Sequence, residues 1–179
     1  MTRLWHADPW GYRLAFVALA LVLLFLRLLP LGRPAGALPG PDMLLCLMIA
    51  WMMRRPDFLP VWLIVPVVLL EDFLLMRPPG LWTALVVMAT EFLRSRIALT
   101  RELNFLTEWL LASGLIVALM LGERVILALT LLPQVSLGPA AVRLAGTILA
   151  YPLIVGASRL ALGLRKPGTG EVDERGRRL

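Results

Sequence analysis

The sequence predicts an all-α integral membrane protein, a polytopic bundle of about six transmembrane helices. Hydrophobic residues make up 59% of the 179-residue chain, and the mean hydropathy is +0.81. Soluble domains are only about 45 to 50% apolar. The apolar residues form successive stretches separated by arginines, prolines and glycines, as expected of helices that cross a bilayer and turn outside it.

The first apolar stretch, residues 14 to 26, reads LAFVALALVLLFL and follows Arg13. A basic flank before an apolar core also occurs in cleavable signal peptides. Here the run continues through Arg27 to Pro30 without a cleavage box, and further apolar stretches follow. We therefore expect an uncleaved first helix.

The second stretch, residues 37 to 53, is less regular because it begins with PGPD and its clearly apolar part, 43 to 53, is short. Asp42 is placed to cap the following helix, since a carboxylate there accepts free backbone N–H groups at the positive end of the helix dipole. We interpret Asp42 as a cap.

The third and fourth helices are expected over residues 58 to 76 and 81 to 93. Pro60 and Pro66 lie in the former and predict a kink. The sequence RPPG between the two helices suits a tight loop where the chain re-enters the bilayer.

Residues 105 to 132 leave two interpretations open. One straight helix of that length would measure about 42 Å, more than the ~30 Å hydrocarbon core. Gly122-Glu123-Arg124 interrupts the apolar run. Either residues 105 to 121 cross and 125 to 132 form a short re-entrant or interfacial piece, or one tilted helix emerges into the headgroup region.

The last stretch, residues 139 to 163, contains Gly146 and Ala150, followed by Ala157 and Ala161. Small residues at helical spacing permit close approach between helices. We expect Gly146 and Ala150 to belong to a face on which another helix docks.

The charges between the stretches predict the orientation, because positive residues concentrate on the cytoplasmic side. With six crossings and a cytoplasmic N-terminus, the outer loops hold chiefly Arg33 and Arg77. The cytoplasmic set is then Arg3, Arg13, Arg54, Arg55, Arg94, Arg96, Arg101, Arg165, Lys166, Arg175, Arg177 and Arg178. A seventh crossing would place the basic tail outside.

These observations divide the chain into three parts. Residues 1 to 13 form a short cytoplasmic N-terminus, and residues 14 to 163 form the transmembrane domain. Residues 164 to 179 form a basic cytoplasmic tail, which lacks apolar side chains over most of its length and is expected to be disordered.

The sequence carries no motif for chemistry: no glycine-rich phosphate loop, no paired histidine and acid, and no nucleophile elbow. Cys46 and His6 are each the only residue of their type, so neither an internal disulfide nor a cysteine-rich metal site is expected. The net charge of +6 is spread between the apolar stretches, which argues against nucleic acid as a partner. We expect no enzymatic activity and no cofactor.

Three acids inside the apolar stretches are the candidate functional residues, because intramembrane carboxylates are costly unless a partner satisfies them. Glu91 lies three residues before Arg94 and is expected to pair with it. Asp72 is expected to snorkel to the outer interface or to pair with Arg77. Glu71 is either a neutral carboxyl hydrogen-bonded within the bundle or a functional group.

The tryptophans all lie close to the ends of expected helices and predict an aromatic belt at the membrane interface. They are Trp5, Trp10, Trp51, Trp62, Trp82 and Trp109.

The segments LLEDFLL and RPPGLWTALVV, preceded by PDMLLCLMIAWMMRRPDFLPVWLIV, resemble the rod shape-determining MreD family of membrane proteins. By this resemblance Asp72, Pro78 and Gly80 occupy the acid, proline and glycine positions of the family, with Glu71 and Pro79 as further matches. Many members carry a glycine a few residues before the acid, where this chain has valine.

The resemblance implies a non-catalytic scaffold of the bacterial cell-elongation machinery in the inner membrane. Its implied partners are the bitopic protein MreC, the actin-like MreB filament and the peptidoglycan synthase pair RodA and PBP2. The family is also similar in fold to the S components of energy-coupling-factor transporters, which bind a ligand in a six-helix bundle. A small-molecule or lipid-binding membrane protein is therefore the alternative. A proton-coupled transporter is disfavoured, because the chain lacks the broken, repeated helices of such proteins.

Overall fold

The computed structural model describes residues 9–29, 39–96 and 104–162, and over these residues the fold is entirely helical. The predictions for residues 1 to 8 and 163 to 179, and for Arg33 and Arg101, concern residues outside these ranges. The elements are α1 (Pro9–Leu28), α2 (Met43–Arg54), the 3-10 turn η1 (Pro56–Phe58), α3 (Val61–Leu74), α4 (Leu81–Ser95), α6 (Phe105–Leu129) and α7 (Leu137–Leu162). Each of the six expected apolar stretches therefore contains a helix.

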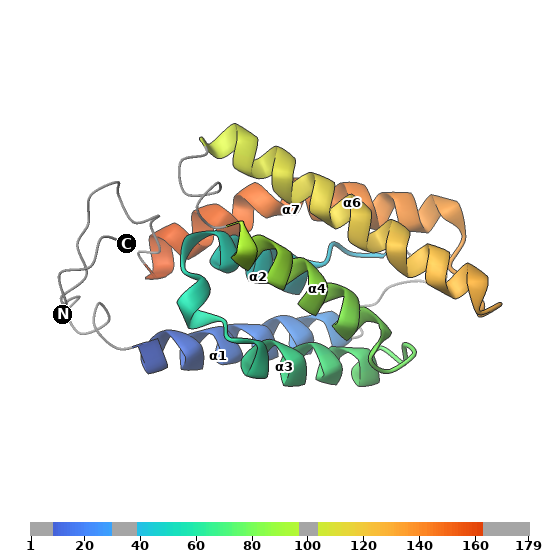
Figure 1. Cartoon of the computed structure of the whole chain (residues 1–179), viewed down its shortest axis with the longest axis horizontal. Helices are drawn as coiled ribbons and strands as arrows, with labels where there is room; N and C mark the ends of the chain where they lie inside the picture. The colour runs from blue at the N-terminus through green and yellow to red at the C-terminus, as the bar shows by residue number, and fades with distance from the viewer. Residues whose placement is uncertain (1–8, 30–38, 97–103, 163–179) are drawn as a thin grey trace.

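Consecutive helices run in opposite directions along the bundle (Figure 1). We call the end where α1, α3 and α6 begin the near end, and the end where they finish the far end. α2, α4 and α7 begin at the far end. This alternation is the arrangement expected of helices that cross a layer in turn.

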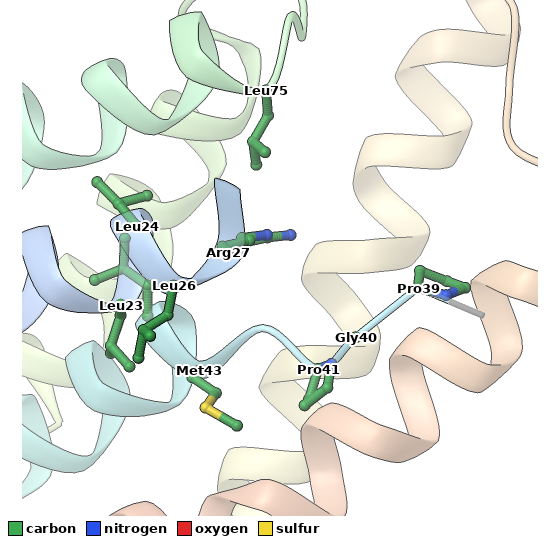
Figure 2. A pocket seen from close by; sticks show the side chains of 10 residues that line it. Leu23, Leu24, Leu26, Arg27, Pro39, Gly40, Pro41, Met43 and Leu75 are labelled. Carbon is green, nitrogen blue, oxygen red and sulfur yellow. The ribbon is translucent and has the colours of Figure 1, made fainter. Parts of the chain in front are cut away.

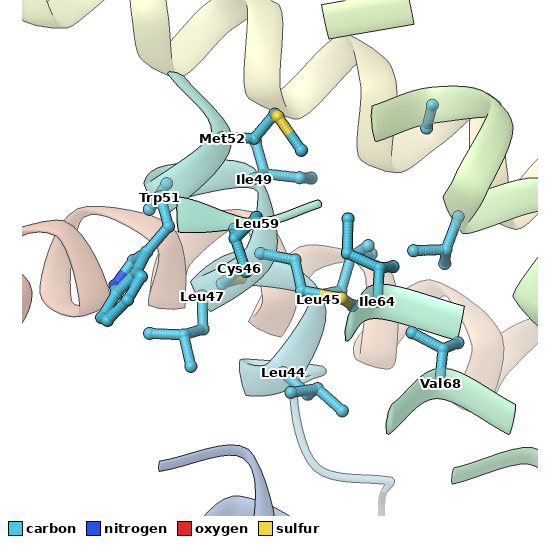
Figure 3. Packing of buried hydrophobic residues seen from close by; sticks show 14 of the residues in the cluster. Leu44, Leu45, Cys46, Leu47, Ile49, Trp51, Met52, Leu59, Ile64 and Val68 are labelled. Carbon is cyan, nitrogen blue, oxygen red and sulfur yellow. The ribbon is translucent and has the colours of Figure 1, made fainter. Parts of the chain in front are cut away.

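Helix α2 is the core of the bundle. It packs against α7, α4 and α1, and all of its residues from Leu44 to Arg54 are buried. Its side chains pack together with Ile64 and Val68 of α3 (Figure 3). A helix that is apolar all round is stable only where neighbours surround it.

Among the residues that the structure describes, three helical segments are long and apolar enough to cross a membrane: Trp10–Leu28, Phe105–Leu129 and Leu137–Leu160. The prediction of an all-α protein with membrane-compatible helices is thus confirmed. Helices α2, α3 and α4 have 12, 14 and 15 residues, or about 18 to 23 Å, short of the ~30 Å hydrocarbon core.

The structure decides between the two interpretations of residues 105 to 132. Helix α6 continues without a break through Gly122, Glu123 and Arg124 and ends at Leu129. The interpretation with two separate pieces is therefore wrong. The chain turns at Leu131, whose φ of 56° is left-handed.

The described tryptophans differ in exposure. Trp10 and Trp62 are 58% and 57% exposed at the near end, and the guanidinium of Arg13 lies 5.0 Å and 5.5 Å from their ring centroids. Trp51 and Trp82 are fully buried. The prediction of an aromatic belt is wrong for these two, because their rings pack inside the bundle. Hydropathy alone does not show which side of a helix faces the interior.

Candidate functional site: a buried charge cluster

Charged side chains from three helices and two connections meet at the far end of the bundle. We define the far-end cluster as Arg27 on α1, Asp42 before α2, Glu71 on α3, Arg77 after α3 and Arg143 on α7. Helix ends that lie far apart in the sequence are adjacent here because the helices alternate in direction (Figure 1).

Asp42 is the centre of this cluster and is completely buried. Its Oδ2 lies 2.7 Å from Nη2 of Arg143 and 3.3 Å from Nη1 of Arg27. The backbone N–H of Asp42 also donates to Oγ1 of Thr147 at 2.9 Å. Asp42 therefore joins α1 and α7 to the start of α2.

The expected capping role of Asp42 is confirmed, since its Oδ1 accepts the backbone N–H of Leu45 at 3.2 Å. The ion pairs were missed. A charge within the last apolar stretch, Arg143, was the available signal, because an intramembrane cation needs a partner.

Glu71 connects α1 to α3. Its Oε1 accepts Nη1 of Arg27 at 2.5 Å, and Nη1 of Arg77 lies 3.9 Å away. The side chain is fully buried. Glu71 is thus hydrogen-bonded within the bundle, and the groups that face it are guanidinium groups.

Asp72 points in another direction and holds the start of α4. Its Oδ2 accepts the N–H of Gly80 at 3.0 Å and both the N–H and the hydroxyl of Thr83, at 3.2 Å and 2.8 Å. The expected snorkelling is wrong, because Asp72 is fully buried. The alternative pairing with Arg77 is wrong too, since the guanidinium of Arg77 lies beside Glu71, at 3.9 Å. Its carboxylate instead satisfies free donors at the positive end of a helix.

The loop before α4 makes this contact possible. Gly80 has a φ of 88°, a left-handed conformation, and directly precedes α4. Only glycine adopts this φ without a steric penalty. Pro78 and Pro79 are exposed at the turn, so the positions that carry the family resemblance shape and cap a turn.

Trp82 lies between the arginines of the far-end cluster. The guanidinium carbons of Arg77 and Arg143 are 5.1 Å and 5.6 Å from its ring centroid, and the ring is fully buried. Cation–π contacts of this kind gain strength where water is excluded.

Glu91 is separate from the cluster. Its Oε1 lies 2.9 Å from Nε of Arg94, one turn along α4, and both side chains are partly exposed. The predicted pairing is confirmed, and the pair is an ordinary surface interaction.

A second buried ion pair at the near end was also missed. Nη2 of Arg54 lies 2.8 Å from Oε1 of Glu108, and the side chains are 0% and 1% exposed. The hydroxyl of Tyr151 donates to the same carboxylate oxygen at 2.9 Å. Arg54 was interpreted as a cytoplasmic loop charge, whereas it closes the core between α2, α6 and α7.

The small-residue face of α7 is used inside the chain. A Cβ added at Gly146 would lie 3.7 Å from Cβ of Pro41, and Ala150 is buried. Cys46 on α2 donates to the carbonyl of Thr147 on the same face. Gly146 and Ala150 therefore lie where α7 packs against the start of α2.

In chemical terms the cluster is a set of ion pairs and caps that fasten helices together. Within the described parts of the chain, no three His, Cys, Asp or Glu side chains are grouped so as to hold a metal ion. Comparison with known protein families, with curated proteins and with solved structures finds no match. Fold and site define a helical protein with membrane-compatible helices and buried inter-helix ion pairs.

Proposed function

We propose that this protein is a non-catalytic scaffold of the bacterial cell-elongation machinery, of the MreD kind, in the inner membrane. One observation supports the scaffold role most. Asp42, Glu71 and Asp72 are all engaged in inter-helix ion pairs or a helix cap. Carboxylates in such contacts stabilise the packing of the helices, and they are not free to bind or activate a substrate.

The MreD assignment rests on the residues of the LLEDFLL and RPPGLW segments. Their geometry gives the resemblance a physical reason, because the acid, Asp72, holds the glycine turn before α4. The acid and the glycine that make this contact lie eight positions apart in the chain.

The proposed topology has six crossings with both ends of the chain in the cytoplasm. Helices α2, α3 and α4 are shorter than the hydrocarbon core, but arginines at helix ends extend toward the headgroups and local thinning accommodates short helices. Arg96 and Arg159 are exposed at the near end, which agrees with a cytoplasmic near end.

The proposed partners are those of the family: an MreC-like bitopic protein, an MreB-like filament and the RodA and PBP2 synthase pair. The exposed arginines of the near end suit the cytoplasmic filament. The transmembrane helix of an MreC-like protein would dock on an apolar outer face, since the face of Gly146 is occupied by Pro41.

The test is depletion of this protein in its own bacterium, followed by imaging of cell shape and of new peptidoglycan. We expect rounded cells with dispersed or lost lateral insertion, restored by the wild-type gene. A matched pair of rescue variants is Asp72→Ala, which removes the turn contact, and Glu91→Ala, which removes only a surface pair; only the second should rescue. Normal shape after depletion would refute the proposal.

The alternative, a lipid or small-molecule binder, has one observation in its favour, a groove beside Arg27 at the far end. A thermal-shift panel of vitamins and lipid precursors tests it as the primary function. No stabilisation by any compound would remove it from consideration.

A further inference from the structure

A groove of about 440 Å³ opens at the far end between α1, the segment before α2, and the end of α3 (Figure 2). Its described lining is Leu23, Leu24, Leu26, Arg27, Pro39, Gly40, Pro41, Met43, Leu44 and Leu75. This volume lies in the range of small-molecule sites, which are mostly apolar with a few placed polar groups. Arg27 is the only charged side chain among these residues.

Arg27 is paired, but it keeps free donors. Among the described residues, both of its carboxylate partners, Asp42 and Glu71, contact Nη1. The side chain is 23% exposed, whereas both carboxylates are fully buried. Nε and Nη2 therefore remain available to donate, and this edge of a guanidinium matches the two oxygens of a phosphate group.

The carboxylates of the far-end cluster leave one edge of Arg27 open. Three guanidinium groups, those of Arg27, Arg77 and Arg143, face the buried carboxylates of Asp42 and Glu71, and the carboxylate of Glu123 lies 4.0 Å from Arg143. The charges of these groups balance, so the cluster itself supplies no excess charge. A ligand at Arg27 is therefore selected by the free Nε and Nη2 donors, which match phosphate oxygens.

The walls of the groove are suited to hydrocarbon. Leu26 and Met43 on its rim are 49% and 42% exposed, so the groove continues onto the outer apolar surface. Arg27 lies one residue before the end of α1, where a membrane-crossing helix reaches the headgroup level. An amphiphilic ligand in this groove would therefore place its polar group at Arg27 and its hydrocarbon chain along the leucines.

We propose that this groove binds a membrane phospholipid, with its phosphate on the Nε and Nη2 edge of Arg27 and an acyl chain along Leu23, Leu26 and Met43. The inference needs only that the chain lies in a membrane, so it is independent of a role in cell elongation. Basic pockets between transmembrane helices bind lipid headgroups by the same physics.

The experiment measures lipid binding to the purified full-length protein in detergent by native mass spectrometry. The probes are dioleoyl phosphatidylglycerol and dioleoylglycerol, which share their chains and differ in the phosphate-bearing headgroup. We expect the phospholipid to bind at least about fivefold more tightly. Equal binding of the two lipids would overturn the proposal.

Two tryptophan variants on α1 supply a matched comparison. Leu26→Trp fills the groove, while Leu21→Trp adds the same bulk at a position outside it; the leucines are 49% and 48% exposed. We expect Leu26→Trp alone to weaken phospholipid binding by about fivefold or more. Equal behaviour of the two variants, at equal melting temperature, would refute the site.

Arg27→Lys tests the headgroup contact separately, because lysine keeps the charge beside Asp42 and Glu71 and loses the two-pronged edge. The variant should keep some preference for the phospholipid but a smaller one than the wild type; an unchanged preference would argue against the two-pronged contact. Competition by millimolar inorganic phosphate as strong as by the phospholipid would identify a free-anion site and overturn the lipid assignment.

Discussion

The buried pair of Arg54 and Glu108 gives a sharp prediction about stability. Glu108→Leu removes the carboxylate and leaves a guanidinium that is 0% exposed without its partner. Loss of one member of a buried pair costs about 3 to 5 kcal/mol, because the remaining charge stays desolvated. The lost hydrogen bond from Tyr151 adds about 1 kcal/mol.

The double variant Arg54→Met with Glu108→Leu should recover most of that loss. Replacing both charges by apolar groups of similar volume leaves no desolvated ion, and such replacements are often neutral or stabilising by about 1 to 4 kcal/mol. The recovery therefore separates the cost of an unpaired charge from the cost of altered packing.

The assay is unfolding of the detergent-solubilised protein by a denaturing detergent, followed by the total tryptophan fluorescence, to which the buried Trp51 on α2 contributes. Glu91→Ala is the control, since its pair with Arg94 is partly exposed and should contribute less than about 1 kcal/mol. A Glu108→Leu variant as stable as Glu91→Ala, or a double variant as unstable as the single one, would refute this reasoning.

Three further variants test the far end, each by thermal unfolding in detergent. Asp72→Ala should destabilise by about 1 to 2 kcal/mol, because the N–H groups of Gly80 and Thr83 lose their acceptor, and an unchanged melting temperature would contradict this capping role. Gly80→Ala should cost about 1 kcal/mol from its φ of 88° alone, since a Cβ there meets nothing within 4 Å; Gly80→Asn should cost less, and the opposite order would argue against backbone strain. Gly146→Ala should be tolerated at 3.7 Å from Pro41, whereas Gly146→Leu should separate α7 from the start of α2; equal stability of the two would mean that this face is not packed.

Sequence patterns predicted the helices well because each apolar stretch must satisfy its own backbone hydrogen bonds. The Asp42 cap and the Glu91–Arg94 pair were also predictable, since both join residues three positions apart. The same local reasoning misassigned Asp72. A carboxylate near Arg77 suggests an ion pair. In the structure, however, the turn at Gly80 places the start of α4 beside Asp72, and the carboxylate accepts the N–H groups of Gly80 and Thr83.

Composition and charge spacing by themselves determined the helical class with membrane-compatible helices, the positions of the helices and the buried acids that required partners. Only the tertiary structure decided those partners, because the deciding contacts join distant residues: Arg27 with Glu71, Asp42 with Arg143 and Arg54 with Glu108. A buried charge is stable only beside an opposite charge, and the packing of the helices determines which opposite charge lies near it. Helix packing likewise decided that α2, one of the least regular stretches in the sequence, would form the core.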